Sequence, residues 1–391
     1  MADQLNHGDY GLYASVMAYS LIAVPLITFG FEQYVYKYYI NKGSSICYLK
    51  WYANISTVTL AILSLVVYLN CVSIEVAIFF VSQAWLLILL SFYQCAKNYT
   101  AFSITSAVIP LLRFGFIFAF FNIDNASIQT VLNSLFWSSI LTAVYCSISC
   151  WQVAKALDLQ RKESGLFLQG HLKLKDAFDY AFASISFAIY FQGSIIFISK
   201  LLSYEDVAIF SAAYLIVTTS YLLPSIIYQK YIIPILHDKM QNINQCKNTY
   251  VNLNFYSFMV GLVVAILVAL LSGVIIDIFF NDTYNASIEI LRYLSLAILI
   301  KYISSSAAAF MMTNEYIKVK NKMMIISAFS NVALCWLLIS HYGVTGAIIS
   351  VIISELVIGL SYIIYCSRYV FKVSVFKSFN YNEKWEWREL K

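Results

Sequence analysis

Hydrophobic residues along this chain gather in long runs, and polar residues fall between them. A helix needs about 20 apolar residues to cross ~30 Å of hydrocarbon, and about eleven runs approach that length. They are residues 11–31, 51–69, 74–95, 101–121, 128–150, 176–199, 207–229, 253–275, 288–313, 323–340 and 344–366. Because lipid offers the backbone no hydrogen bonds, runs this long predict helices rather than barrel strands. The expected fold class is an all-α polytopic membrane protein.

The composition indicates that lipid is the main solvent of this chain. Of its 391 residues, 61% are hydrophobic and 12% are charged, so a soluble globule would lack polar side chains for its surface. The eight cysteines lie mostly inside apolar runs, with no CxxC motif and no histidine at metal-ligand spacing. We interpret them as inert filler, and the sequence predicts neither a metal site nor a cofactor.

The basic residues predict how the chain is oriented. Short cytoplasmic loops of membrane proteins retain lysine and arginine, and loops on the other side hold few. Most of the 25 basic residues fall in alternate loops and in the C-terminal tail, whereas the opposite loops hold Lys200 and otherwise mainly acidic or neutral residues. This asymmetry predicts an external N-terminus and a cytoplasmic C-terminus. It also makes the net charge of +5 a topology signal rather than a nucleic-acid patch.

Two segments resemble each other and indicate an internal repeat. Gly8 to Ser15 opens the first run, Glu205 to Ala212 opens the seventh, and each run carries a proline further on, Pro25 or Pro224. The run at 176–199 precedes the second segment, and nothing corresponds to it before the first. We therefore expect two pseudo-repeated lobes of five plus six helices, in which a first helix has been lost or left out of the chain as given.

The repeat divides the chain into four expected parts. They are an N-terminal lobe of five helices over 1–150, a cytoplasmic inter-lobe loop over 151–175, a C-terminal lobe of six helices over 176–366, and a cytoplasmic tail over 367–391.

Short glycine and aromatic motifs recur along the chain in a characteristic order. They are Gly8-Asp9-Tyr10-Gly11-Leu12-Tyr13, Tyr93-Gln94-Cys95-Ala96-Lys97-Asn98-Tyr99, Val207 to Tyr214, Phe280-Asn281-Asp282-Thr283-Tyr284, Ile290 to Ala297, Tyr342-Gly343-Val344-Thr345-Gly346-Ala347 and Ser354-Glu355. From Gly8 to about Cys366 the chain resembles the polysaccharide repeat-unit flippases, the O-antigen translocase branch of the multidrug/oligosaccharidyl-lipid/polysaccharide exporter superfamily. Members of that family usually begin with an additional helix. Their sixth helix in this register carries a proline and an aspartate-arginine pair, where this chain has Gln192 and Gly193.

The resemblance implies a lipid-linked oligosaccharide flippase rather than an enzyme. Such a protein moves an undecaprenyl-diphosphate-linked oligosaccharide from the cytoplasmic to the periplasmic leaflet of the bacterial inner membrane by alternating access. Its expected partners are the lipid bilayer and, beside it, a polysaccharide polymerase and a chain-length regulator. The N-terminus would then be periplasmic.

Charged residues inside the apolar runs are the candidates for a polar pathway, because each costs ~2.5 to 3.5 kcal/mol at the bilayer centre on insertion scales. Arg113 lies near the middle of its run, where it could meet the substrate diphosphate bidentately or bond a neighbouring helix. Lys301 and Arg292 share one run, and nine residues at about 100° each place them on opposite faces. Lys301 is the deeper and the stronger substrate-binding candidate, whereas Arg292 could instead pair with Glu289 one turn before it.

Glu355, central in the last run, is the only carboxylate that we expect to be deeply buried in a helix. It could couple transport to a proton or another cation, or it could neutralise a buried base. Both roles stay open at this point.

Three other functions compete with the flippase. A drug or cation antiporter of the same superfamily would be expected to carry more intramembrane acids, and an O-antigen polymerase would need paired carboxylates on a larger external loop than 276–287. A non-transporting remnant is the third. The chain has no nucleotide-binding motif that would indicate ATP-driven pumping.

Overall fold

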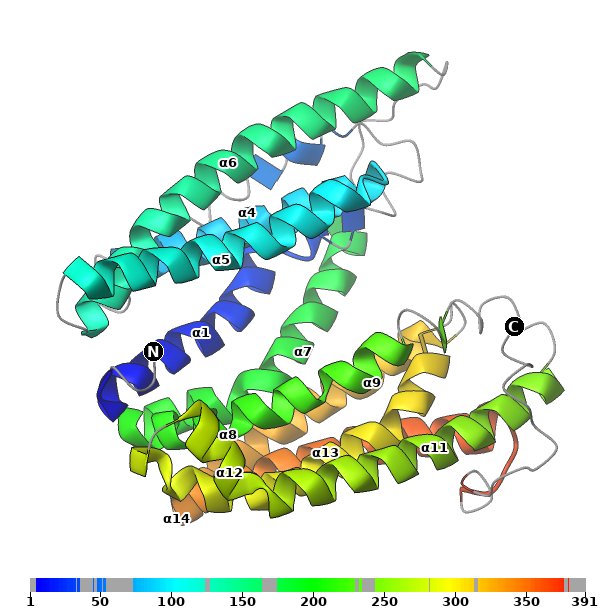
Figure 1. The fold of residues 1–391 in the computed structure, drawn as a ribbon. Coiled ribbons are helices and arrows are strands. Elements are labelled where there is room, and N and C mark those ends of the chain that lie inside the picture. Colours follow the sequence, from blue (N-terminus) through cyan, green and yellow to red (C-terminus); the bar gives the residue numbers. More distant parts are fainter. Residues whose placement is uncertain are drawn as a thin grey trace. The chain divides into compact units, whose positions relative to one another are not determined.

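The computed structural model of this protein is helical throughout the part of the chain that it describes (Figure 1). The described residues are 5–32, 34–35, 45, 48–50, 52–53, 73–123, 127–163, 174–228, 232–233, 243–280, 282–312, 316–375 and 379. Within them, eight helical segments are long and apolar enough to cross a membrane. The predicted all-α polytopic fold is therefore confirmed. Most of the expected helix at 51–69 and most of the tail at 367–391 lie outside the described residues.

The chain divides into two compact units, and the division falls within one helix. The N-terminal unit is Gln4–Ala188, and the C-terminal unit is Ile189–Lys391 together with Met1–Asp3. Helix α7 (Leu174–Leu201) contributes to both. The lobe boundaries expected from the repeat stay a prediction.

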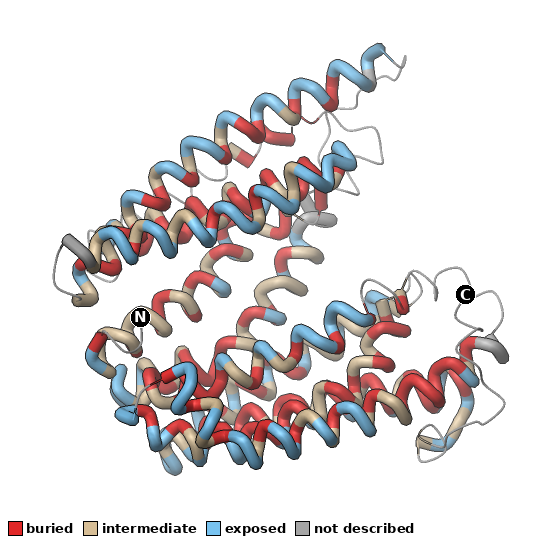
Figure 2. The backbone as a smooth tube through the Cα atoms, viewed as in Figure 1, coloured by how far each residue is buried: buried red, intermediate tan, exposed pale blue. Residues whose placement is uncertain are grey.

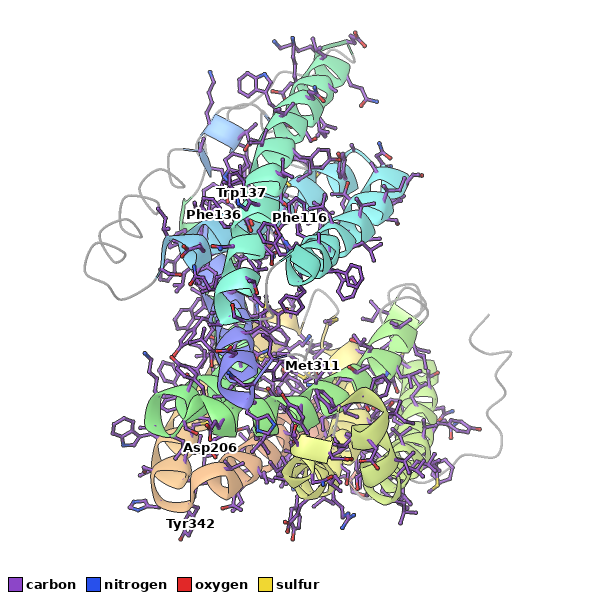
Figure 3. The ribbon with its side chains drawn as sticks, turned by 60° about the vertical axis from the view of Figure 1, so that its left-hand side comes forward. Phe116, Phe136, Trp137, Asp206, Met311 and Tyr342 are labelled. Atoms are coloured by element: carbon purple, nitrogen blue, oxygen red, sulfur yellow. The ribbon has the colours of Figure 1, made fainter. Side chains whose placement is uncertain are left out.

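The N-terminal unit is built around α4. This helix (Ile74–Cys95) packs against α1 (His7–Thr28), α5 (Tyr99–Ile123) and α6 (Ile128–Glu163). Most of α4 is buried, whereas α5 turns a largely exposed surface outward (Figure 2). The exposed side chains are mainly apolar, and aromatic ones such as Trp137 of α6 stand on the outside of the unit (Figure 3). An outward apolar surface is what a lipid-facing helix requires.

Helix α6 is longer than the run that predicted it. The apolar run ends near residue 150, but the helix continues through polar residues to Glu163. At 1.5 Å per residue, its 36 residues span about 54 Å, well beyond ~30 Å of hydrocarbon. Part of the segment expected to be a loop, 151–175, is thus helical. Its Asp158 is buried and accepts a hydrogen bond of 2.7 Å from the backbone N–H of Ser45.

The two segments that the sequence pairs as a repeat begin with similar caps. The Asn6 side chain accepts a hydrogen bond of 2.7 Å from the Asp9 backbone N–H at the start of α1. The Ser203 hydroxyl accepts one of 3.1 Å from the Asp206 backbone N–H at the start of α8 (Tyr204–Ser220). In both helices a short polar residue caps the amide of an aspartate three residues later, which is a favoured way to begin a helix.

The C-terminal unit is built around α13 (Ala286–Phe310), which packs against α8, α11 (Ile243–Leu270) and α14 (Ile317–Tyr365). Two expected helices are interrupted. The run at 207–229 forms α8 and then α9 (Leu222–Ile227), with Pro224, which lacks a backbone N–H, just beyond the break. The run at 253–275 continues after a break at Leu271 as α12 (Ser272–Phe279).

Helix α14 is two antiparallel helices joined at Gly343, where φ is 57° and ψ is −136°. Asn331 donates to Ser354 at 3.0 Å, and Cys335 lies 3.4 Å from Ser350, so side chains before and after Gly343 meet in mirrored order. The two predicted helices at 323–340 and 344–366 are therefore both present. Figure 3 places Tyr342 and Asp206 at the same end of the C-terminal unit.

Candidate functional site

A lysine and a glutamate form an ion pair inside the C-terminal unit. The ammonium of Lys301 on α13 lies 3.5 Å from a carboxylate oxygen of Glu355 on the second half of α14. Glu355 is 4% exposed, and the Lys301 side chain is 28% exposed. Within the described residues, this is the one side-chain ion pair closer than 4.0 Å. Glu355 thus contacts a partly exposed base, and the two roles expected for it stay predictions.

Small side chains bring α13 and α14 together at this level. A Cβ atom on Gly359 would lie 3.2 Å from Ser304 and 3.5 Å from Ile300. These two residues flank Lys301, and Gly359 lies one helical turn after Glu355. Close backbone approach at Gly359 thus places the ammonium beside the carboxylate.

Two tyrosine rings enclose the same ammonium. The Lys301 nitrogen lies 5.5 Å from the ring centre of Tyr190 on α7 and 5.2 Å from that of Tyr221, between α8 and α9. A cation within about 6 Å of an aromatic face is attracted by it. We call Tyr190, Tyr221 and Glu355 together the tyrosine cage. The hydroxyl of Tyr302, next to Lys301, donates a hydrogen bond of 3.0 Å to the carbonyl of Ser220. This bond fixes α13 against the end of α8.

Several polar atoms of the cage are buried without a hydrogen bond. The hydroxyls of Tyr190 and Tyr221 interact electrostatically with Glu355 but lack the geometry of a direct hydrogen bond. The Tyr362 hydroxyl is in the same condition, and the Glu355 oxygen that lies 3.5 Å from the Lys301 ammonium accepts no hydrogen bond beside this ion pair. Buried polar groups seldom stay unsatisfied in native proteins, so this region is a polar site and not merely part of a core.

A second polar layer lies beside the cage. A Cβ on Gly193 would stand 2.3 Å from the side-chain oxygen of Asn331, so any larger residue there would require the Asn331 amide to move. The next residue on α7, Ser194, lies 3.3 Å from Ser350 on α14. The lack of a side chain at Gly193 allows α7 to pack on Asn331.

Arg113 lies in the other unit and has a neutral partner. With the Gln83 amide oriented so that its oxygen faces the guanidinium, this oxygen accepts a hydrogen bond of 2.9 Å from one terminal nitrogen of Arg113 and a second from the other. The guanidinium carbon lies 5.3 Å from the ring centre of Phe79, and no described carboxylate is within 4.0 Å of the guanidinium. Arg113 therefore keeps an uncompensated charge between α4 and α5, half-buried.

Arg292 is exposed on α13. It precedes Lys301 by nine residues, which is about 14 Å along the helix axis at 1.5 Å per residue. Its Nε donates a hydrogen bond of 3.4 Å to the hydroxyl of Ser272 on α12. The expected ion pair with Glu289 is not formed within 4.0 Å. The i,i+3 hypothesis is wrong here because Arg292 turns toward α12 instead.

Sequence reasoning also missed residues that the structure brings to these sites. Glu355 is not the only deeply buried carboxylate, because Asp158 in the extension of α6 is 4% exposed as well. The sequence carried no signal for Tyr190 and Tyr221, since the chain holds 31 tyrosines and nothing separates these two from the rest. Nothing in the sequence singled out Gln83 either. Within the described part of the chain, no group of three or more His, Cys, Asp or Glu side chains could hold a metal ion.

The architecture defines the class of protein as a multi-pass helical membrane protein. The particular match is a solved structure of the lipid II flippase MurJ in an inward closed conformation. The superposition has a TM-score of 0.58 and covers 92% of this chain and 81% of that chain, at 15% sequence identity. Similarity at this level of identity shows the fold. No protein-family model and no curated protein matches the sequence.

Proposed function

We propose that this protein translocates lipid-linked oligosaccharides across the membrane that holds it. The observation that carries the proposal is the fold, which is shared over most of both chains with a flippase of a lipid-linked precursor. The order of the glycine and aromatic motifs supports a more specific assignment, to undecaprenyl-diphosphate-linked O-antigen or related repeat units. Transport would run from the cytoplasmic to the periplasmic leaflet of a bacterial inner membrane by alternating access.

Arg113 is the strongest candidate for contact with the diphosphate. Its guanidinium can bind two phosphate oxygens at once, and its present partner, the Gln83 amide, leaves its charge uncompensated. Lys301 is a weaker candidate because Glu355 already neutralises it. Arg292, exposed near the end of α13, would act at the rim of the pathway.

Glu355 could couple transport to ion movement, because protonation of its carboxylate would release Lys301. The expected orientation, with a periplasmic N-terminus and a cytoplasmic C-terminus, follows from the distribution of basic residues. A polysaccharide polymerase and a chain-length regulator would receive the translocated substrate.

The drug or cation antiporter remains the second candidate function. Its support is that Glu355 and two tyrosine rings are suited to an organic cation. The nitrogen of Lys301 already occupies that place, which favours the flippase.

The test is complementation of a bacterium that lacks its own repeat-unit flippase. We expect the chain to restore surface polysaccharide, Arg113→Gln to abolish the restoration, and Lys318→Ala, at an exposed lysine on α14, to leave it intact. Absence of restoration by the wild-type chain, with normal membrane insertion, would overturn the proposal.

A further inference from the structure

The surroundings of Lys301 are those of an organic cation bound to a protein. Two tyrosine faces and a carboxylate surround the ammonium, at 5.2 Å and 5.5 Å from the ring centres and 3.5 Å from an oxygen. Proteins that bind alkylammonium ligands use aromatic faces in this way, because the ring quadrupole attracts the charge while the apolar ring accepts the alkyl groups.

The walls of the cage and its occupant come from different elements. Tyr190 is on α7, Tyr221 joins α8 to α9, and Glu355 is on the second half of α14. Lys301 alone comes from α13. Removal of its side chain would therefore leave the cage walls in place.

Contacts that do not involve Lys301 hold these walls. The hydroxyl of Tyr214 on α8 donates a hydrogen bond of 2.7 Å to the carbonyl of Phe191, which is next to Tyr190 on α7. The side-chain amide of Asn331 donates a hydrogen bond of 3.0 Å to the hydroxyl of Ser354, which is next to Glu355. The cage is also open on one side, since the Lys301 side chain is 28% exposed.

We propose that Tyr190, Tyr221 and Glu355 form a binding site for small organic ammonium ions, and that Lys301 fills it as a tethered occupant. Lys301 is then a specificity-determining residue. By holding the cage, it excludes cationic compounds from a site whose one buried carboxylate would otherwise attract them. This inference uses contacts within the C-terminal unit alone and does not depend on the flippase proposal.

The charged and titratable groups around the site agree with a single bound cation. Glu355 is the carboxylate that faces it, and Tyr190, Tyr214, Tyr221 and Tyr362 interact electrostatically with that carboxylate. Lys320 at the start of α14 is near enough to Lys301 to repel it. A second cation would meet this repulsion without a second carboxylate, so the native cage has capacity for one.

The test is chemical rescue in the purified full chain. Lys301→Ala removes three carbons and the nitrogen, which n-propylammonium replaces. We expect n-propylammonium to raise the Tm of Lys301→Ala saturably, by about 2 to 4 °C, and to leave wild type and Lys318→Ala unchanged. In the Lys301→Ala background, Glu355→Gln or Tyr221→Leu should each abolish the response.

Neutral n-propanol separates charge recognition from simple filling of space. An equal Tm increase with n-propanol would overturn the proposal, as would a response of wild type equal to that of Lys301→Ala. If Lys301→Ala is not recovered folded, n-propylammonium present during extraction should restore recovery. Failure of that restoration, or equal restoration by n-propanol, would also count against the cage. Complementation in cells can fail without affecting any of these outcomes.

Discussion

Asn331 donates a hydrogen bond of 3.0 Å to Ser354 across 23 residues of sequence, because the chain reverses direction at Gly343. The φ of 57° and ψ of −136° at this glycine belong to a region that side chains strongly disfavour. One backbone position thus joins two helices into an antiparallel pair.

Gly343→Ala should therefore destabilise the protein by about 1 to 3 kcal/mol. The matched control is Gly115→Ala in α5, where an added Cβ meets nothing within 4 Å and where alanine favours a helix. Thermal unfolding of both variants in detergent checks this. Equal Tm values for the two variants would mean that the turn tolerates a side chain.

Gly193→Ala should be destabilising for a different reason. Its Cβ would stand 2.3 Å from the Asn331 side-chain oxygen, and Asn331 is held by Ser354. Overpacking of this kind costs about 1 to 3 kcal/mol. Adding Asn331→Ala should recover part of the loss, so a double-mutant cycle on Tm should show favourable coupling. Strict additivity would contradict the contact.

The Lys301–Glu355 pair should respond asymmetrically to loss of either charge. Lys301→Met leaves a carboxylate that is 4% exposed without its counter-ion, a change that costs about 3 to 5 kcal/mol at buried sites. Glu355→Gln leaves a lysine with a route to solvent, so its cost should be smaller. The double variant should be more stable than Lys301→Met alone. Denaturant or thermal unfolding gives the order, and a greater loss for Glu355→Gln would contradict this view of the pair.

Arg113→Lys should separate charge from geometry. Lysine keeps the charge but cannot bind two phosphate oxygens as a fork. We expect transport in the complementation assay to fall by roughly ten-fold or more, in line with the loss of a charge-assisted hydrogen bond, while Tm changes little. A fall in Tm that accounts for the lost activity would instead assign Arg113 a structural role against Gln83.

Glu32, just beyond the end of α1, should make stability depend on pH. Burial raises the pKa of its carboxyl above the ordinary 4.5, and hydrogen bonds with Thr28 and Ser184 only partly offset this effect. The native state therefore holds the proton more tightly than the unfolded chain does. The resulting stabilisation is full below pH 4.5 and is lost as pH rises through the raised pKa.

Glu32→Gln should accordingly be more stable than wild type at neutral pH, and the difference should vanish in acid. Tm measured for both proteins from pH 4 to pH 8 is the check, with Glu75→Gln in the first turn of α4 as the control. A difference independent of pH would contradict the raised pKa.

Much of the helix assignment was accessible from the sequence. Apolar runs predicted α1, α4 and the second half of α14 to within a few residues, because an unbroken run in lipid can satisfy its backbone only as a helix. The C-terminal end of α6 and the breaks at Tyr221 and Leu271 were not accessible. They depend on packing, such as the contact of Asp158 with Ser45, between segments far apart in the chain.

The candidate residues divide in the same way. Arg113, Lys301 and Glu355 were identifiable because a charge inside an apolar run is costly wherever the fold places it. Their partners were not. Gln83 and Tyr221 are ordinary members of their helices until the neighbouring helix is known.

The sequence by itself determined that this is a helical membrane protein and which of its charges lie within hydrocarbon-length runs, because both properties depend on residues next to one another. Only the tertiary structure decided that Lys301 meets Glu355 between two tyrosine rings, while Arg113 keeps a neutral partner. The physical reason is that an ion pair requires two side chains within a few ångströms. That distance is set by which helices pack together and by the small residues, such as Gly359, that let them approach.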